Sequence, residues 1–225
     1  MIYWLSHYVL KFITLTYFRG ECEGREKFPA KGPFIAVVNH NSLLDVAAAA
    51  MVADFRATAM VKHTLFEVPL LSWWLRAIGM FPVVRDSGDE QAFQKALEVL
   101  KRGGIFFIAA EGTRWHHGVR PRPRTGFVRL AQMARCPVVP VAIQGTREAL
   151  PPGAWFPRPV KITAMVGEPM WLPPVLLAPD NKPILQKQAN AVMDRIYEMV
   201  AIMEQRSQKQ PNVGTIESMP RVRRL

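Results

Sequence analysis

The sequence has little cysteine and no internal repetition. Its 225 residues include two cysteines, Cys22 and Cys136, which are too few for a disulfide framework. No short apolar stretch ends in a small-residue cleavage site, so nothing indicates secretion and we expect a reducing, cytosolic setting. No repeat, low-complexity tract or long linker divides the chain, and its length predicts one globular domain.

Acidic residues are also scarce relative to basic ones. The chain has 18 Asp and Glu against 29 Lys and Arg, which gives a formal net charge of +11 and a pI near 10.1. This excess predicts an anionic partner, which by charge alone is a nucleic acid, a lipid head group or a phosphorylated cofactor.

A long uncharged apolar run is absent even where the chain is most apolar. The first segment, MIYWLSHYVLKFITLTYFRG, is interrupted by His7, Lys11 and Arg19. A membrane-spanning helix needs about 20 nearly uncharged residues, whereas a helix lying in the membrane interface tolerates basic residues among aromatic ones. We therefore favour an interfacial helix over residues 1–20, with a spanning helix and an ordinary core helix as the alternatives.

Apolar and amphipathic segments alternate through the rest of the chain. Several apolar runs are rich in Val, Ile and Phe, as expected of strands that are buried on both faces. The predicted strands are 34–38, 57–61, 80–84, 104–109, 137–143 and 160–166. The predicted helices are 42–53, 67–78, 89–102, 126–135 and 183–204. The alternation predicts an α/β fold, with a mostly parallel central sheet flanked by helices, over residues 21–210. We expect residues 211–225 to be a basic C-terminal tail.

Three local patterns make further structural predictions. Ser42 with Asp45, and Ser87 with Glu90, have the spacing of a capping box at a helix start. Pro140 interrupts an apolar run, which predicts an edge strand or a bulge there. The consecutive large residues around Trp73 and Trp74 predict a helix that is either buried on all sides or partly in contact with lipid or an acyl chain.

A histidine and an aspartate stand where an apolar strand meets a helix, in the stretch FIAVVNHNSLLDVAAAA. Ligands gather beyond the carboxyl ends of parallel strands, which is where His40 lies. If His40 precedes the helix, the turn folds it back toward Asp45, which would hold one ring nitrogen and leave the other as a general base. The alternative is that Asp45 only stabilises the helix start. A metal site is disfavoured because no third ligand converges on the pair.

Polar residues follow other predicted strands as well. Lys62 follows the second strand, Arg85 the third, and the EGTR stretch with Glu111 and Arg114 the fourth. Cations after three strands, together with a His–Asp pair after another, indicate a phosphate site beside a base.

Four blocks in this order, NHNSLLD, GMFPVVR, EGTR and CPVVPVAI, resemble the glycerolipid acyltransferase family that includes the 1-acyl-glycerol-3-phosphate acyltransferases. The resemblance covers about residues 25 to 170. It implies that His40 is the catalytic base and Asp45 its orienting partner. The substrate-binding residues that it implies are Lys62, Gly79, Arg85, Glu111, Gly112, Thr113 and Arg114.

The resemblance implies an O-acyltransferase of phospholipid biosynthesis. Such an enzyme moves a fatty acyl chain from an acyl-CoA or acyl-carrier-protein thioester, a co-substrate, to a lysophospholipid hydroxyl, and needs no metal or other cofactor. The expected acceptor is 1-acyl-glycerol-3-phosphate and the product phosphatidic acid. Glycerol 3-phosphate or another lysolipid is the alternative acceptor. A more distant alternative for the function is hydrolysis of a thioester or a lipid.

Given this resemblance, we expect the anionic partner to be a membrane surface and the protein to be attached to its cytoplasmic face. No nucleic acid is expected, because the basic residues follow strands and no recognition motif is evident.

Two features depart from the family pattern. Trp115 stands after EGTR where the family often has a small polar residue, and His116 and His117 follow it. The N-terminal region also has one apolar segment where many relatives have two or more. The first departure bears on acceptor preference, and the second on how the protein attaches to a membrane.

Overall fold

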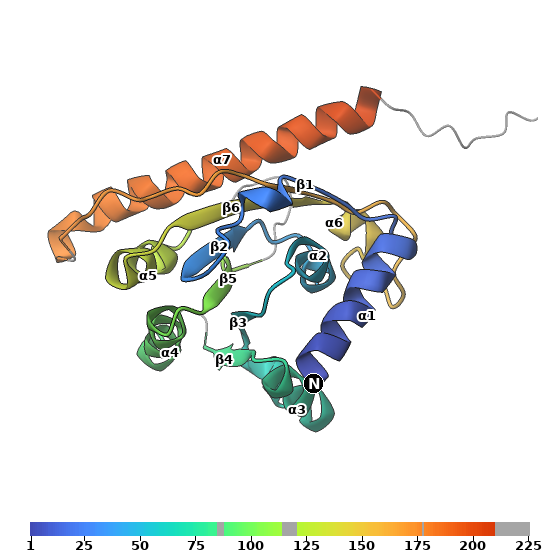
Figure 1. The fold of residues 1–225 in the computed structure, drawn as a ribbon, viewed down its shortest axis with the longest axis horizontal. Coiled ribbons are helices and arrows are strands. Elements are labelled where there is room, and N and C mark those ends of the chain that lie inside the picture. Colours follow the sequence, from blue (N-terminus) through green and yellow to red (C-terminus); the bar gives the residue numbers. More distant parts are fainter. Residues whose placement is uncertain (85–87, 114–120, 177, 210–225) are drawn as a thin grey trace, which may run out of the picture.

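Strands from the whole length of the chain form one mixed sheet (Figure 1). The computed structural model describes residues 1–84, 88–113, 121–176 and 178–209. Within these ranges the strands are β1 (Glu21–Glu23), β2 (Phe34–Val38), β3 (Ala57–Lys62), β4 (Phe81–Val83), β5 (Ile105–Ala109), β6 (Val138–Gln144) and β7 (Thr163–Val166). Their order is β1-β7-β6-β2-β5-β3-β4. The run from β6 to β4 is parallel, and β7 pairs with β6 in the antiparallel sense.

Helices cover both faces of this sheet. The α-helices are α1 (Ile2–Thr16), α2 (Asp45–Val52), α3 (Pro69–Ala77), α4 (Glu90–Lys101), α5 (Gly126–Ala134), α6 (Thr146–Ala149) and α7 (Lys182–Lys209), and the 3₁₀ helices are Arg25–Lys27, His63–Phe66 and Pro179–Asn181. One apolar core lies between the sheet and α4, α5 and α7, and a second lies between the sheet and α2. The predicted α/β fold with a mostly parallel central sheet is confirmed. The predictions omitted β1 and α6, which are too short to show a periodic pattern.

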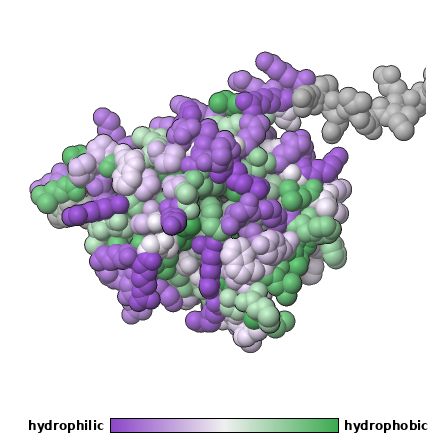
Figure 2. All heavy atoms as spheres, viewed as in Figure 1, coloured by the Kyte–Doolittle hydropathy of each residue, from purple (hydrophilic) through white to green (hydrophobic). Residues whose placement is uncertain are grey.

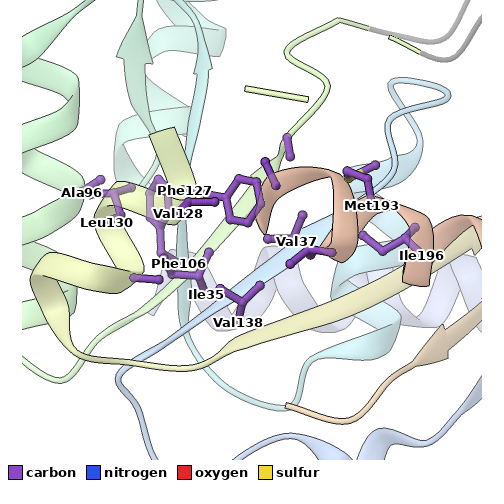
Figure 3. Packing of buried hydrophobic residues seen from close by; sticks show 14 of the residues in the cluster. Ile35, Val37, Ala96, Phe106, Phe127, Val128, Leu130, Val138, Met193 and Ile196 are labelled. Carbon is purple, nitrogen blue, oxygen red and sulfur yellow. The ribbon is translucent and has the colours of Figure 1, made fainter. Parts of the chain in front are cut away.

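The central strand β2 explains how the two cores form. All five of its residues are buried, because alternate side chains point to opposite faces and both faces are covered. Ile35 and Val37 join the core under α5 and α7 (Figure 3), while Phe34, Ala36 and Val38 join the core under α2.

The start of α4 differs from the predicted capping box. The N-cap is Asp89, whose side chain accepts the N–H of Ala92 at 2.9 Å, while Ser87 lies outside the described residues. Asp89 also accepts the N–H of Val84 at 3.0 Å, and these backbone N–H groups lower the pKa of its carboxyl. An aspartate at this position satisfies free helix donors as a serine would.

The prediction that Pro140 marks an edge or a bulge is wrong. Pro140 lies within β6, between β2 and β7, opposite Val37 of β2. Its carbonyl oxygen accepts the N–H of Gly167 at 2.8 Å. The N–H and C=O of one strand residue point to the same side, so the position where Pro140 lacks an N–H also faces Gly167. Because β7 ends before Gly167, the proline removes no hydrogen bond between β6 and β7.

Of the two alternatives for α3, burial on all sides is wrong. Leu75 is the buried residue of α3, whereas Trp73 is 58% exposed and Leu70 is 77% exposed. The indole N–H of Trp74 donates to Ser6 Oγ at 3.0 Å, so α3 packs against α1 through its other side.

The N-terminal helix α1 is part of the folded domain. Its inner side buries His7 and Thr14, and Thr14 Oγ1 donates to the Ala47 carbonyl of α2 at 3.1 Å. No helix among the described residues is both long and apolar enough to cross a membrane.

We expect Phe106→Ala to lower the free energy of unfolding by about 3–5 kcal/mol, because Phe106 is fully buried beneath α4 and α5 and truncation leaves a cavity. Urea unfolding measures the change. The matched control is Phe12→Ala. Phe12 lies on α1 and is 67% exposed, so this change should alter the free energy of unfolding by less than about 0.5 kcal/mol. An equal loss in both variants would contradict this description of the core.

Candidate active site

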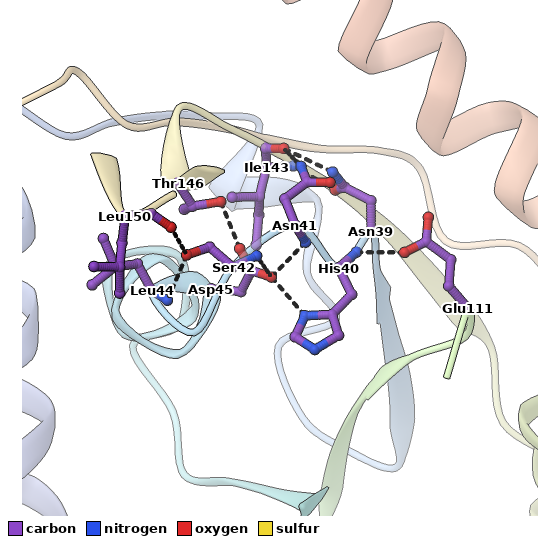
Figure 4. A network of polar contacts seen from close by, with 10 residues as sticks. All are labelled: Asn39, His40, Asn41, Ser42, Leu44, Asp45, Glu111, Ile143, Thr146 and Leu150. Carbon is purple, nitrogen blue, oxygen red and sulfur yellow. Dashed lines mark hydrogen bonds and ion pairs between the residues drawn. The ribbon is translucent and has the colours of Figure 1, made fainter. Parts of the chain in front are cut away.

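His40 and Asp45 are in direct contact at the carboxyl end of β2. His40 lies two residues beyond the strand, and Asp45 is the first residue of α2. The His40 Nδ1 atom lies 2.7 Å from Asp45 Oδ2 (Figure 4). The side chain of Asp45 is 7% exposed and that of His40 is 19% exposed, so the pair is largely shielded while part of the imidazole remains accessible.

The carboxylate of Asp45 accepts hydrogen bonds on both of its oxygens. The backbone N–H groups of Asn41 and Ser42 donate to Oδ2 at 2.8 and 3.0 Å. Thr146 Oγ1, fully buried on α6, lies 2.6 Å from Oδ1. The bond from Ser42 N–H is one half of the predicted capping box, although α2 itself begins at Asp45 and has no side-chain cap.

This arrangement fixes which nitrogen of His40 carries a proton. Asp45 Oδ2 already accepts two backbone N–H groups, so it acts as an acceptor and the Nδ1–H of His40 donates to it. In the neutral ring, Nε2 is then an acceptor with its lone pair free. Figure 4 shows this side of the ring pointing away from Asp45. His40 therefore has the geometry of a general base.

Glu111 holds the backbone of His40 from the neighbouring strand end. It follows β5, is 2% exposed, and accepts the backbone N–H of His40 on Oε2 at 2.7 Å. The hydroxyl of Tyr197, on α7, donates to Oε1 at 2.7 Å. Burial raises the pKa of the Glu111 carboxyl, and the two hydrogen bonds oppose that effect. Since protein donors occupy both oxygens, Glu111 supports the loop that carries His40.

Asn39 holds the same loop on its other side. Its side-chain amide donates to the Ile143 carbonyl at 2.8 Å and accepts the Ile143 N–H at 2.8 Å. This pair of bonds joins the end of β2 to β6. The loop with His40 is thus fixed between β5 and β6, which favours a single ring position.

The structure describes some of the remaining predicted site residues and not others. Gly112 follows Glu111 with φ of +69°, and a Cβ there would overlap the Arg124 side chain. Thr113 is next along the chain and is exposed, and Lys62 is exposed at the carboxyl end of β3. Arg85 and Arg114 lie outside the described residues, as do Trp115, His116 and His117.

Gly79 lies apart from the His40 centre. It precedes β4, toward the amino ends of the parallel strands, whereas His40 lies beyond the carboxyl end of β2. Its N–H donates to Arg76 O at 3.0 Å and the next N–H, of Met80, donates to Leu75 O at 2.9 Å. With φ of +83°, Gly79 ends α3 in a Schellman motif, which favours glycine.

Two residues of the site were missed in the sequence. Thr146 follows the strand predicted at 137–143, so the rule that singled out the other strand-end residues also applies to it. No sequence pattern singles out Tyr197, because it lies within a long helix whose apolar stripe indicates only packing against the core. Among the described residues, no group of three His, Cys, Asp or Glu side chains is placed to hold a metal ion.

A parallel sheet with a contacting histidine and aspartate beyond its carboxyl edge is the arrangement expected of an α/β enzyme that uses a general base. Comparison with known proteins defines the class further. The sequence model of the family described as Acyltransferase matches residues 19–144. The chain therefore belongs to the acyltransferase family.

Individual relatives are similar over most of the chain. A 1-acyl-sn-glycerol-3-phosphate acyltransferase of Bacillus subtilis is 29% identical over 182 residues, covering 80% of this chain and 88% of that protein. A chloroplastic 1-acyl-sn-glycerol-3-phosphate acyltransferase of Brassica napus is 26% identical over 142 residues, and the match spans 41% of its length. The crystal structure of the 1-acyl-sn-glycerophosphate (LPA) acyltransferase PlsC from Thermotoga maritima superposes with a TM-score of 0.64 at 26% identity, covering 85% of this chain and 80% of that one.

We expect Thr146→Val to lower kcat roughly tenfold or more, because a buried oxygen of Asp45 loses its hydroxyl donor and the carboxylate no longer holds His40 in one position. Thr146→Ser keeps the hydroxyl and should retain most of the activity. Steady-state acyl transfer measures both variants. If valine and serine lower kcat equally, the hydroxyl is not what positions Asp45.

Proposed function

We propose that this protein transfers a fatty acyl chain from a thioester to the free hydroxyl of 1-acyl-glycerol-3-phosphate, which gives phosphatidic acid. The observation that carries the proposal is the 2.7 Å contact between His40 and Asp45 at the carboxyl edge of the sheet, in a chain of the acyltransferase family. The names of its relatives from Bacillus subtilis and Thermotoga maritima support the same acceptor.

His40 is the base in the proposed reaction. Its Nε2 takes the proton of the acceptor hydroxyl as the hydroxyl oxygen bonds to the thioester carbonyl carbon. The carbon–sulfur bond then breaks, and the thiolate leaves with the proton that the imidazolium returns. Asp45 stabilises the imidazolium through Nδ1–H, so no covalent acyl-enzyme is needed. A positioned general base typically contributes about 10²–10⁴ in rate.

The acceptor phosphate requires cations near His40. Lys62 is exposed at the carboxyl end of β3 and would contact the phosphate there. The family resemblance assigns phosphate binding to Arg85 and Arg114 as well. Glu111 is better suited to holding His40 than to binding the acceptor, since it is buried, its oxygens are occupied, and a carboxylate repels a phosphate. Gly79 remains a family-based prediction.

The apolar outer side of α1 supports attachment to a membrane surface. Leu5, Tyr8 and Phe12 are each more than 60% exposed and share one helix face, with Val9 between them. Leu70 and Trp73 of the neighbouring α3 are exposed as well. Figure 2 shows apolar surface over this part of the molecule. A monomer rarely exposes so many large apolar side chains together, and lipid would cover them.

In the test, the wild-type protein is incubated with labelled acyl-CoA or labelled acyl-acyl-carrier-protein as the donor. The acceptors are a panel of lysolipids and glycerol 3-phosphate, and the acylated products are identified. We expect acylated 1-acyl-glycerol-3-phosphate as the main product. We expect His40→Ala to lower kcat by about 10²–10⁴ and Asp45→Asn to lower it less, since the ring is then misoriented but present. The matched control Asp194→Asn, an exposed carboxylate on α7, should leave kcat unchanged.

Three results would contradict the proposal. Release of free fatty acid without an acylated lipid would indicate a hydrolase. Faster acylation of glycerol 3-phosphate would indicate the other acceptor. Full activity in His40→Ala would exclude His40 as the base.

A further inference from the structure

A concave region lies between α5 and the amino end of α7, and His40 is not among the residues that line it. Its volume is about 770 Å³, within the range of small-molecule sites. The polar residues that line it include Arg122, Thr125, Arg129, Lys182, Gln186 and Lys187. We refer to this region, defined by these residues, as the α5–α7 groove. Figure 1 shows the beginning of α7 beside α5.

All the charged side chains that line the α5–α7 groove are positive. Four of its lining residues are cations and none is a carboxylate. In the part of the chain that the structure describes, none of these four cations forms an ion pair. Four like charges around one concavity repel one another and raise the local potential, so the groove favours a ligand with several negative charges.

Two further features favour an anion at the same place. The helix α7 begins at Lys182, so the positive end of its dipole lies at the groove. The Arg129 guanidinium lies 4.6 Å from the centre of the Phe93 ring, which restrains it. The groove also has apolar lining from Ala178, Pro183 and Leu185, against which a planar ring would pack.

The α5–α7 groove is connected to the His40 centre through the chain. Gln186 Nε2 donates to Pro123 O at 3.0 Å, and the N–H of the next residue, Arg124, donates to Ala110 O at 2.8 Å, beside Glu111. From Gln186 to Tyr197, which contacts Glu111, α7 advances roughly 16 Å. A ligand seated in the groove therefore needs an extended arm to approach the end of the site where Tyr197 contacts Glu111.

We propose that the α5–α7 groove binds the phosphates of a coenzyme A thioester, the acyl donor. This inference rests on the proposed acyl transfer. Coenzyme A carries a diphosphate and a 3′-phosphate on a planar nucleoside, which fit four cations with apolar lining. Its pantetheine arm has the bond count of about four extended residues and so spans at most roughly 14 Å, comparable with the separation along α7. A carrier protein presents a single phosphodiester, for which four cations around a concavity are not required.

Binding tests the groove without catalysis. The probe is 3′,5′-adenosine diphosphate, titrated into the full chain by calorimetry. We expect the double variant Lys182→Glu with Lys187→Glu to bind it at least tenfold more weakly. The control, Lys31→Glu with Lys101→Glu, reverses two exposed lysines outside the groove and changes the net charge equally, so it should bind within about twofold of the wild type. No binding to the wild type, or equal loss in both variants, would overturn the proposal.

Kinetics identify which substrate the groove serves. In the groove variant we expect KM for acyl-CoA to rise about tenfold, while KM for acyl-dephospho-CoA rises less and KM for the lysolipid is unchanged. A rise in the lysolipid KM, or a rise for acyl carrier protein without one for acyl-CoA, would overturn the proposal.

The two proposals fail in different ways. If the wild type transfers no acyl chain from any donor, the proposed function fails, and the binding titration still decides whether the groove holds a nucleotide. If transfer occurs and 3′,5′-adenosine diphosphate does not bind, the function stands and the groove proposal is wrong.

Discussion

The Asp45 carboxylate is the group on which the geometry of the candidate site depends. It accepts hydrogen bonds from the backbone of Asn41 and Ser42, from the Thr146 hydroxyl and from the His40 ring. A buried carboxylate without these donors would carry a large desolvation cost, so the loop, α2 and α6 adopt positions that supply them. One interaction centre thereby sets the start of a helix, the path of a loop and the tautomer of a histidine.

The parallel sheet brings these donors together. Because β5 and β6 each pair with β2 in the parallel sense, the residues that follow the three strands meet at one edge. His40, Glu111 and Thr146 are far apart in the chain and lie within one hydrogen-bonded network as a result. Asn39 links β2 to β6, and Glu111 links β2 to α7 through Tyr197. The network therefore spans both helical layers.

Most of the central sheet was predictable from the sequence. Strand β2 matches its predicted range, and the other long strands differ by one to three residues at their ends. Apolar runs buried on both faces give a strong signal, because few other structures tolerate them. The errors have local causes. Pro140 was misread because the end of β7, which leaves its missing donor without a partner strand, cannot be recognised in the sequence of β6. Strand β1 and helix α6 are too short to show a period.

The site separates what the sequence determined from what only the tertiary structure decided. The sequence determined that a histidine and an aspartate stand between a buried strand and a helix, five positions apart, because strand and turn preferences act over neighbouring residues. The tertiary structure decided that Tyr197 reaches Glu111, that Thr146 reaches Asp45 and that Gly79 lies apart from His40. These outcomes depend on strand order, register and helix docking, which result from packing between distant segments.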